Sequence, residues 1–240
     1  NLLDQVHENP EKRLSEIRKT LLMLEPPEEL FSDLLRAMNR SPLQQKEKVW
    51  MCIKRVWASK WNERAYLSRK ARGIPHNNIV MAVLIQQIIE AEYAFVIHTQ
   101  NPFTGDSREL YAEVVLGLGE TLVSNYPGRA LSFTIRKGES GINLLSYPSK
   151  SIGLFGSGFI FRSDSNAEDL AGYAGAGLYD SVLLSPPRKV LLQYKEEPLV
   201  WNMDFRRNIL NSIAKIGMIV ENLSGSPQDI EGAYAGGKYY

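Results

Sequence analysis

The spacing of apolar residues changes once along this chain, close to residue 75, and that change limits the possible folds more than any other feature. Over residues 11–72 apolar side chains recur at three- and four-residue steps, which is the period of a helix. From residue 79 onward they gather in short runs between turn residues, which is typical of strands. The sequence therefore predicts an α+β fold, with a helical segment at 1–75 and mostly antiparallel sheets in 76–240.

Prolines and glycines divide the helical segment into three predicted helices. The first is stopped by Pro26 and Pro27, and a short second helix covers 28–38. The third begins after Pro42 and continues until Gly73. One face of this third helix carries large apolar residues that we expect in the core: Trp50, Ile53, Trp57 and Trp61.

The second part of the chain predicts strands and one further helix. Five runs have the composition of strands: 81–89, 93–99, 109–116, 130–136 and 158–162. Apolar residues at helical spacing predict a helix at 204–223, which Gly225 closes. A strand is expected at 228–232, and residues 238–240 read as a strand leaving a hairpin.

Charge and composition exclude some classes of partner. The chain has 28 Lys and Arg against 27 Asp and Glu, a formal net charge of +1, so its overall field would not hold nucleic acid or an anionic membrane. Its apolar runs fall far short of the roughly 20 residues that cross a bilayer. The one cysteine, Cys52, cannot form a disulfide within the chain, and we expect it in the core or on a helix surface. Because the net charge is so small, any anion site must depend on a local group of cations.

A first candidate site follows the strand predicted at 109–116. Gly117 and Gly119 would let the backbone approach a ligand, and the carboxylate of Glu120 could contact a metal or a ribose hydroxyl. The alternative is structural, because a turn that ends a strand often needs glycine in any case.

A second candidate site begins at Arg162, which emerges from an apolar strand before short polar side chains and a glycine-rich run at 171–177. Guanidinium groups bind phosphate oxygens with two parallel hydrogen bonds, and glycine lets backbone N–H groups approach phosphate, so this pattern indicates a polyphosphate site. The alternative is the start of a helix, with Ser165 or Asn166 as its N-cap and Glu168 in its first turn.

A third candidate site is the pair Asp229 and Glu231, which alternation places on one face of the predicted strand. Two neighbouring carboxylates repel each other unless a cation lies between them, and magnesium with nucleotide phosphates is a natural occupant. The alternative is a solvent-facing edge strand. His98 lies in another strand, where a hydrogen-bonded structural role is more common than catalysis, and the three histidines show no metal-ligand spacing.

Five segments occur in a characteristic order: VWASKWNERAYLSRK at 56–70, YAFVIHTQNPFTGD at 93–106, YAEVVLGLGETLV at 111–123, FRSDSNAEDLAGYAGAGLYDSV at 161–182 and QDIEG at 228–232. Together they resemble the C-terminal nucleotide-binding domain of the alpha-glucan water dikinases, which phosphorylate starch in plants. That domain is similar in turn to the ATP-binding domain of pyruvate phosphate dikinase and phosphoenolpyruvate synthase.

The resemblance implies an ATP-grasp-like domain that binds ATP with Mg²⁺. It gives Arg162 contact with the nucleotide phosphates and a catalytic role in steadying the charge that develops during transfer. Glu120 would contact the nucleotide or its metal, and Gln86 would lie near the adenine. Asp229 and Glu231 would be the magnesium ligands.

The family reaction implied is transfer of the β-phosphate of ATP to a histidine on another domain of the same protein and then to glucosyl residues of starch, with AMP and phosphate released. That histidine, a lysine-bearing glycine loop before Asn1 and a Gln-Thr-Arg-Pro segment after Tyr240 are expected outside these residues, so the sequence reads as a fragment that is inactive alone. The partners expected are ATP, the phosphohistidine domain and, through other domains, glucan. A plastid location is expected, with the cytosol as the alternative.

Two other interpretations remain open at this stage. The same domain could belong to a pyruvate-type dikinase, although the VWASKWNERA and AGYAGAGLYDS segments favour glucan. The chain could also be a non-catalytic glucan-binding scaffold, although its four tryptophans fall at the spacing of a helical core rather than of an exposed aromatic platform.

Overall fold

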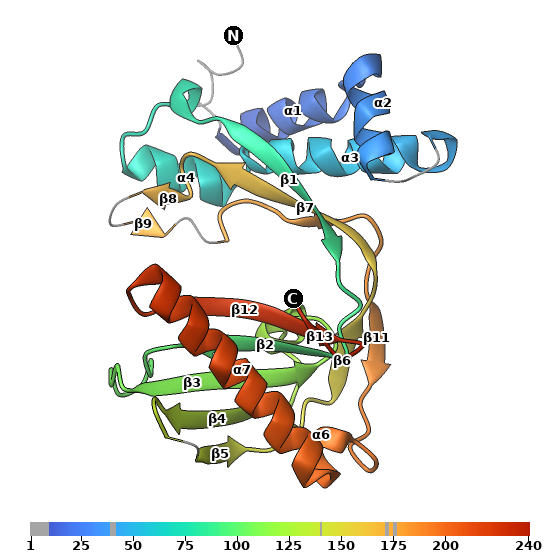
Figure 1. Ribbon diagram of the computed structural model, residues 1–240. Helices are drawn as coiled ribbons and strands as arrows, with labels where there is room; N and C mark the ends of the chain where they lie inside the picture. The colour runs from blue at the N-terminus through green and yellow to red at the C-terminus, as the bar shows by residue number, and fades with distance from the viewer. Residues whose placement is uncertain (1–9, 39–41, 140, 171–172, 175–176) are drawn as a thin grey trace. The chain divides into compact units, whose positions relative to one another are not determined.

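The computed structural model describes residues 10–38, 42–139, 141–170, 173–174 and 177–240 (Figure 1). The chain divides into two compact units, and each combines segments distant in sequence. Residues 1–88 and 158–185 make up the first unit, and residues 89–157 and 186–240 the second. The helical segment expected at 1–75 is thus part of the first unit. The fold class is confirmed as α+β with mostly antiparallel strand pairing.

The first unit packs helices on one face of a small sheet. Its helices are α1 (Pro10–Leu22), α2 (Glu28–Ala37), α3 (Pro42–Ser59), α4 (Glu63–Ala71) and the 3₁₀ turn η1 (His76–Asn78). The sheet has the order β1 (Met81–Ile88), β7 (Gly158–Ser165) and β10 (Val182–Leu183), and β8 (Asp169–Leu170) pairs with β9 (Tyr173–Ala174). Alternate residues of β1 and β7, among them the fully buried Phe161, pack against α2 and α3. On the opposite face, which we call the open face, the described side chains of Leu84 and Arg162 are exposed.

The prediction of a single helix from Pro42 to Gly73 is wrong, because α3 ends at Ser59 and α4 begins at Glu63. Three successive backbone N–H groups, those of residues 60–62, donate to carbonyls three residues back, which tightens the chain into a turn. Arg18 Nη1 donates to the freed carbonyl of Trp61 at 2.7 Å, and Arg69 donates to that of Lys60. These two arginine contacts, from residues outside the turn, therefore stabilise the break between α3 and α4. The spacing of apolar residues does not predict that break.

The break also places Trp61 in a different cluster from its predicted neighbours. Trp61 packs with Leu14 and Ile17, whereas Trp50 packs with the residues that cover the sheet. The expectation that all four tryptophans are core residues is wrong for Trp201, which is 69% exposed. Cys52 is buried, as expected.

The second unit is a six-stranded antiparallel sheet covered on one face by a long helix (Figure 1). The strand order is β13 (Lys238–Tyr239), β12 (Asp229–Ala235), β2 (Tyr93–His98), β3 (Glu109–Leu116), β4 (Leu131–Arg136) and β5 (Ile142–Ser146). The helix is α7 (Met203–Ser224), whose Ile209 and Ile213 pack on Phe95 and Ile97. The other elements are α5 (Glu120–Val123), α6 (Pro198–Trp201) and the antiparallel pair β6 (Ile152–Phe155) and β11 (Arg188–Leu191).

The strands and the last helix agree with their predicted positions to within a few residues. The predicted hairpin near the last residues is also confirmed, as β12 and β13. Gly225 closes α7 in the left-handed conformation, at φ 72°. No helix among the described residues is both long and apolar enough to cross a membrane.

Gly232 of β12, next to Glu231, provides a test of how this strand packs on β2. A Cβ at this position would lie 2.4 Å from two ring atoms of Phe95 and 3.0 Å from the carbonyl oxygen of Tyr240. We therefore expect Gly232→Ala to lower the free energy of unfolding by about 1–3 kcal/mol, because the Phe95 ring has no room to move in a close-packed core. Chemical denaturation measures the change.

The matched control is Gly141→Ala, where nothing lies within 4 Å of the added Cβ. That substitution should be neutral or slightly stabilising. Equal stability of the two variants would show that the close approach of β12 and Phe95 is not as described.

Candidate functional site

Arg162 and Gln86 meet on the open face of the first unit's sheet. In the antiparallel register Arg162 lies opposite Leu84 and Gln86 opposite Ile160, so the two side chains are diagonal neighbours on the same face. Nη1 of Arg162 donates to Oε1 of Gln86 at 3.4 Å, a long hydrogen bond that leaves the other guanidinium donors available. Both side chains are exposed, and the buried Phe161 fixes the strand beneath them.

The segment after Arg162 is a turn and a short hairpin, so the alternative of a capped helix start is wrong. Ser165 is the last residue of β7, and its hydroxyl donates to the carbonyl of Val80 at 2.9 Å instead of capping a helix. Glu168 accepts a hydrogen bond from Ser163 Oγ at 2.5 Å. Asn166 is held by the backbone of Asn78 and Val80. Residues 171–172 and 175–176 of the predicted glycine-rich loop lie outside the described residues.

Asp229 and Glu231 lie on the face of the second unit's sheet that is opposite α7. Their partners on β2 are His98 and Val96, and both carboxylates are exposed. Alternation places them on the same face roughly 7 Å apart along the strand. Among the described residues, no strand pairs with 229–232 on the side away from β2, so the edge-strand description is accurate there. The open edge leaves both carboxylates accessible to a ligand.

His98 is hydrogen-bonded, as its strand position suggests, but its partner is a predicted metal ligand. Nδ1 of His98 lies 2.6 Å from Oδ1 of Asp229. The imidazole lies beside the ring of Tyr111, whose hydroxyl donates to Oε1 of Glu113 at 2.6 Å. Burial, together with this hydrogen bond, raises the pKa of Tyr111, so its hydroxyl stays protonated at neutral pH. Sequence reasoning missed the His98–Asp229 contact because it depends on the register of β2 with β12.

A polar hollow of about 540 Å³ opens beside Asp229. Its lining comes from the end of β2, the loop before β3 and the start of β12: His98, Gln100, Asn101, Pro102, Gly105, Pro227, Gln228 and Asp229. The sequence predicts a turn here, from Asn101-Pro102 with Gly105-Asp106, and the segment also forms part of the family resemblance. No binding role was predicted for these residues, because that role depends on the neighbouring start of β12.

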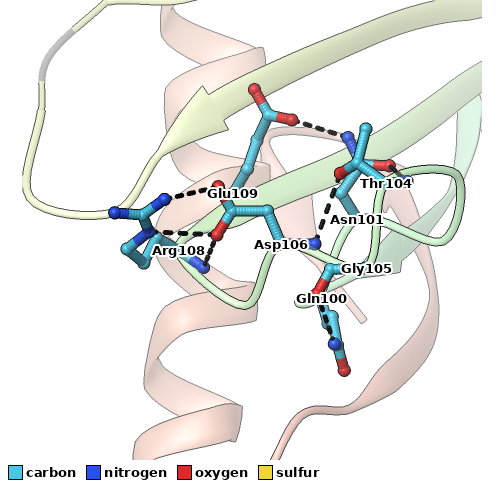
Figure 2. Close-up of polar contacts among 7 residues, drawn as sticks. All are labelled: Gln100, Asn101, Thr104, Gly105, Asp106, Arg108 and Glu109. Carbon is cyan, nitrogen blue, oxygen red and sulfur yellow. Dashed lines mark hydrogen bonds and ion pairs between the residues drawn. The ribbon is translucent and has the colours of Figure 1, made fainter.

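The loop wall of the hollow is ordered by its own side chains (Figure 2). Oδ1 of Asn101 accepts from the backbone N–H of Phe103 at 2.9 Å, and its Nδ2 donates to Glu109 at 2.6 Å. Asp106 binds the Arg108 guanidinium with both carboxylate oxygens, at 3.1 and 3.2 Å. Gln100 donates to the carbonyl of Gly105 at 2.7 Å. The hollow is therefore preformed by the loop's own hydrogen bonds.

Glu120 is exposed and begins α5, which packs through Leu122 on Ala94, on the sheet face that carries Asp229. The neighbouring Gly119 lies over Ala94, since a Cβ at residue 119 would be 4.0 Å from that of Ala94. The structural reading of the motif holds for Gly117, whose φ is +83° and whose Cβ would lie 2.3 Å from the carbonyl oxygen of Leu154. Glycine is therefore required at 117 for structural reasons. The exposed carboxylate of Glu120 remains accessible to a ligand.

The predicted site residues thus form two groups, one in each unit. Arg162 and Gln86 belong to the first, and Asp229, Glu231 and Glu120 to the second. Among the described residues, no group of three or more His, Cys, Asp or Glu side chains could hold a metal ion by itself. Magnesium bound with a nucleotide needs only one or two carboxylates, because phosphate oxygens and water complete its shell. The exposed pair Asp229 and Glu231 fits that requirement.

Comparison with known proteins relates this geometry to a family. Residues 40–130 match the family described as pyruvate phosphate dikinase, AMP/ATP-binding domain. The chain is 51% identical, over 100% of its length, to the chloroplastic alpha-glucan water dikinase of Solanum tuberosum, of which it covers 17%. It is 47% identical over 100% of its length to alpha-glucan water dikinase 2 of Arabidopsis thaliana, covering 19% of that protein.

The similarity to a pyruvate-type relative is weaker. The phosphoenolpyruvate synthase of Pyrococcus furiosus is 26% identical over 76% of the chain, which covers 20% of that protein. The chain therefore spans a fifth or less of the length of these three relatives. Percentage identity is about twice as high with the two glucan water dikinases, and it extends over a larger share of the chain. The chain belongs to the alpha-glucan water dikinase family, as its five ordered motifs predict.

Proposed function

We propose that this chain is the ATP-grasp-type domain that binds Mg-ATP in an alpha-glucan water dikinase, with the helical segment 1–75 as part of the nucleotide-binding region. The observation that carries the proposal is the open pair Asp229 and Glu231, which lies beside a preformed polar hollow in a chain whose residues 40–130 match an AMP/ATP-binding domain. In this role Asp229 and Glu231 bind Mg²⁺, which neutralises phosphate charge and orients the transferred group.

The other contacts with the nucleotide are made by Arg162, Gln86 and Glu120. Arg162 binds phosphate oxygens and steadies the charge that develops on them during transfer, because its guanidinium is exposed and keeps free donors. Gln86 lies near the adenine and orients Arg162 through their hydrogen bond. Glu120 contacts the nucleotide or its metal from the far end of the same sheet face as Asp229.

These roles and the family support a proposed reaction for the full-length protein. The β-phosphate of ATP passes to a histidine of another domain and from there to a glucosyl hydroxyl of starch, while the γ-phosphate is transferred to water and AMP leaves. The partners are ATP, that phosphohistidine domain and, through other domains, glucan. A plastid location accords with the printed names of chloroplastic relatives.

Label transfer tests this function against its alternatives. In the full-length protein, ATP labelled at the β-phosphate should yield labelled glucan and no labelled pyruvate product. Transfer to pyruvate would support the pyruvate-type alternative instead. Tight amylopectin binding without any Mg-ATP binding would support a scaffold, for which the exposed Trp201 offers an aromatic surface.

The 240-residue chain by itself should not phosphorylate glucan. None of its histidines lies in a motif like that of the phosphorylated histidine, and His98 is held by Asp229. The measurement is incorporation of labelled phosphate into amylopectin, with the full-length protein as the positive control. Incorporation above background by the isolated chain would contradict this expectation.

His98 should act as a positioning residue for Asp229. We expect His98→Ala to weaken Mg²⁺ binding in the ATP complex about threefold to tenfold, because the 2.6 Å hydrogen bond that orients the carboxylate is lost. A Mg²⁺ titration at fixed ATP measures the change. His98→Asn, which keeps a nitrogen donor, should restore part of the affinity, whereas equal loss in both variants would mean that the ring only fills space.

A further inference from the structure

A second polar hollow, of about 240 Å³, opens on the helical side of the first unit. Arg162 lies on the sheet face that points away from α3, whereas this hollow lies among the helices that cover the opposite face. The hollow is therefore separate from the residues assigned to the nucleotide. Its polar lining comes from α1, α3, the turn after α3 and the segment before β10, and includes Ser15, Arg18, Lys19, Arg55, Asn62 and Asp180.

Positive charge is concentrated in this hollow. Three cations, Arg18, Lys19 and Arg55, line it from two neighbouring helices, and the one carboxylate in its lining is that of Asp180. Glu16 also acts on Lys19, but its carboxylate is paired with Arg13 at 2.7 Å. The Asp180 carboxylate is already bound by the Arg64 guanidinium and by Nδ2 of Asn62, at 3.1 Å from the latter. The whole chain carries a net charge of only +1, so the excess is local.

The cations differ in what else they bind. Arg18 donates one N–H to the carbonyl of Trp61 at 2.7 Å, which holds its half-buried guanidinium at the wall. Lys19 and Arg55 are exposed, so both can reach an anion in the hollow. Converging like charges repel one another, so an anion in the hollow would relieve a cost that scattered surface cations do not have.

We propose that this hollow binds a phosphate group, either as orthophosphate or as a phosphate monoester. Two guanidinium groups and an ammonium match a doubly charged tetrahedral oxyanion, and arginine can bind two of its oxygens at once. Ser15 and Asn62 add neutral polar groups, and Leu22 and Ala58 form an apolar wall for the carbon portion of an ester. The inference does not depend on the nucleotide site proposed above.

Calorimetric titration of the full-length protein, in buffer with EDTA so that no metal bridges the anion, tests this site. Orthophosphate and glucose 6-phosphate are the probes, and glucose is the uncharged comparison. We expect saturable binding of at least one phosphate probe with a Kd of about 1 mM or tighter. Tighter binding of the ester would identify a phosphorylated sugar as the ligand, and tighter binding of the free ion would identify orthophosphate.

Variants locate the binding. Lys19→Gln combined with Arg55→Gln should weaken phosphate binding at least tenfold and leave Mg-ATP affinity unchanged. The unfolding midpoint should not fall, because both side chains are exposed and their mutual repulsion is removed. Lys48→Gln, on the same helix α3 but outside the hollow, should have no effect. Absence of saturable binding, unchanged phosphate affinity in the double variant, or equal loss in the Lys48 control would overturn the proposal.

Discussion

Asp229→Asn combined with Glu231→Gln should lower the affinity for Mg-ATP by about 100-fold, which corresponds to roughly 3 kcal/mol. Asp229 lines the polar hollow, and Glu231 lies two residues further along the same strand face. Amide oxygens of the same shape carry no net charge, so they bind Mg²⁺ far more weakly. Equilibrium dialysis with labelled ATP, performed with and without Mg²⁺, measures the loss in the full-length protein.

The same double variant should keep its stability in metal-free buffer. Both side chains are exposed, and asparagine at 229 retains an oxygen that accepts from His98. Removal of two like charges also relieves repulsion on the strand. The matched control is Glu139→Gln with Glu196→Gln, two exposed acids of the same unit, which should bind Mg-ATP as the parent protein does.

Without Mg²⁺ the parent protein should bind ATP no better than the double variant. Retention of Mg-dependent affinity in that variant would remove Asp229 and Glu231 from the site. A large fall in the unfolding midpoint without metal would instead make them structural residues.

Arg162→Lys should reduce phosphate transfer from ATP in the full-length protein by about 100-fold or more, the usual loss when a preorganised donor to a developing charge is removed. Lysine keeps the positive charge but lacks the planar fork that binds two phosphate oxygens, and it cannot keep the same contact with Gln86. Stability should change little, because the side chain is exposed on the open face of β1 and β7.

Single-turnover measurements of AMP release, beside ATP affinity, separate the two roles of Arg162. Loss of rate with modest loss of affinity would indicate a contact made chiefly during transfer. Arg207→Lys, an exposed arginine on α7, is the control and should transfer phosphate at the parent rate. Parent-like affinity and turnover in Arg162→Lys would exclude Arg162 from the site.

Features set by residues close together in sequence could be predicted. The period of the apolar residues located α1, α2, α7 and most strands of the two sheets, because burial of one face sets that period directly. Alternation placed Asp229 and Glu231 on one face of a strand, and the structure has them there on β12.

Features that depend on contacts between distant segments could not be predicted. The break between α3 and α4 is stabilised by Arg18 and Arg69, which bind the freed carbonyls of Trp61 and Lys60. The contact of His98 with Asp229 needs the β2–β12 register, over a separation of 131 residues. The turn after β7 likewise depends on Ser165 binding the carbonyl of Val80 rather than capping a helix.

Calorimetric titration of the full-length protein with ATP, with Mg²⁺ and then with EDTA, tests the central claim most directly. We predict saturable binding in the micromolar range with Mg²⁺, about −8 kcal/mol, and a large loss of affinity when the metal is removed. A folded protein that binds amylopectin but gives no heat with Mg-ATP would contradict the claim.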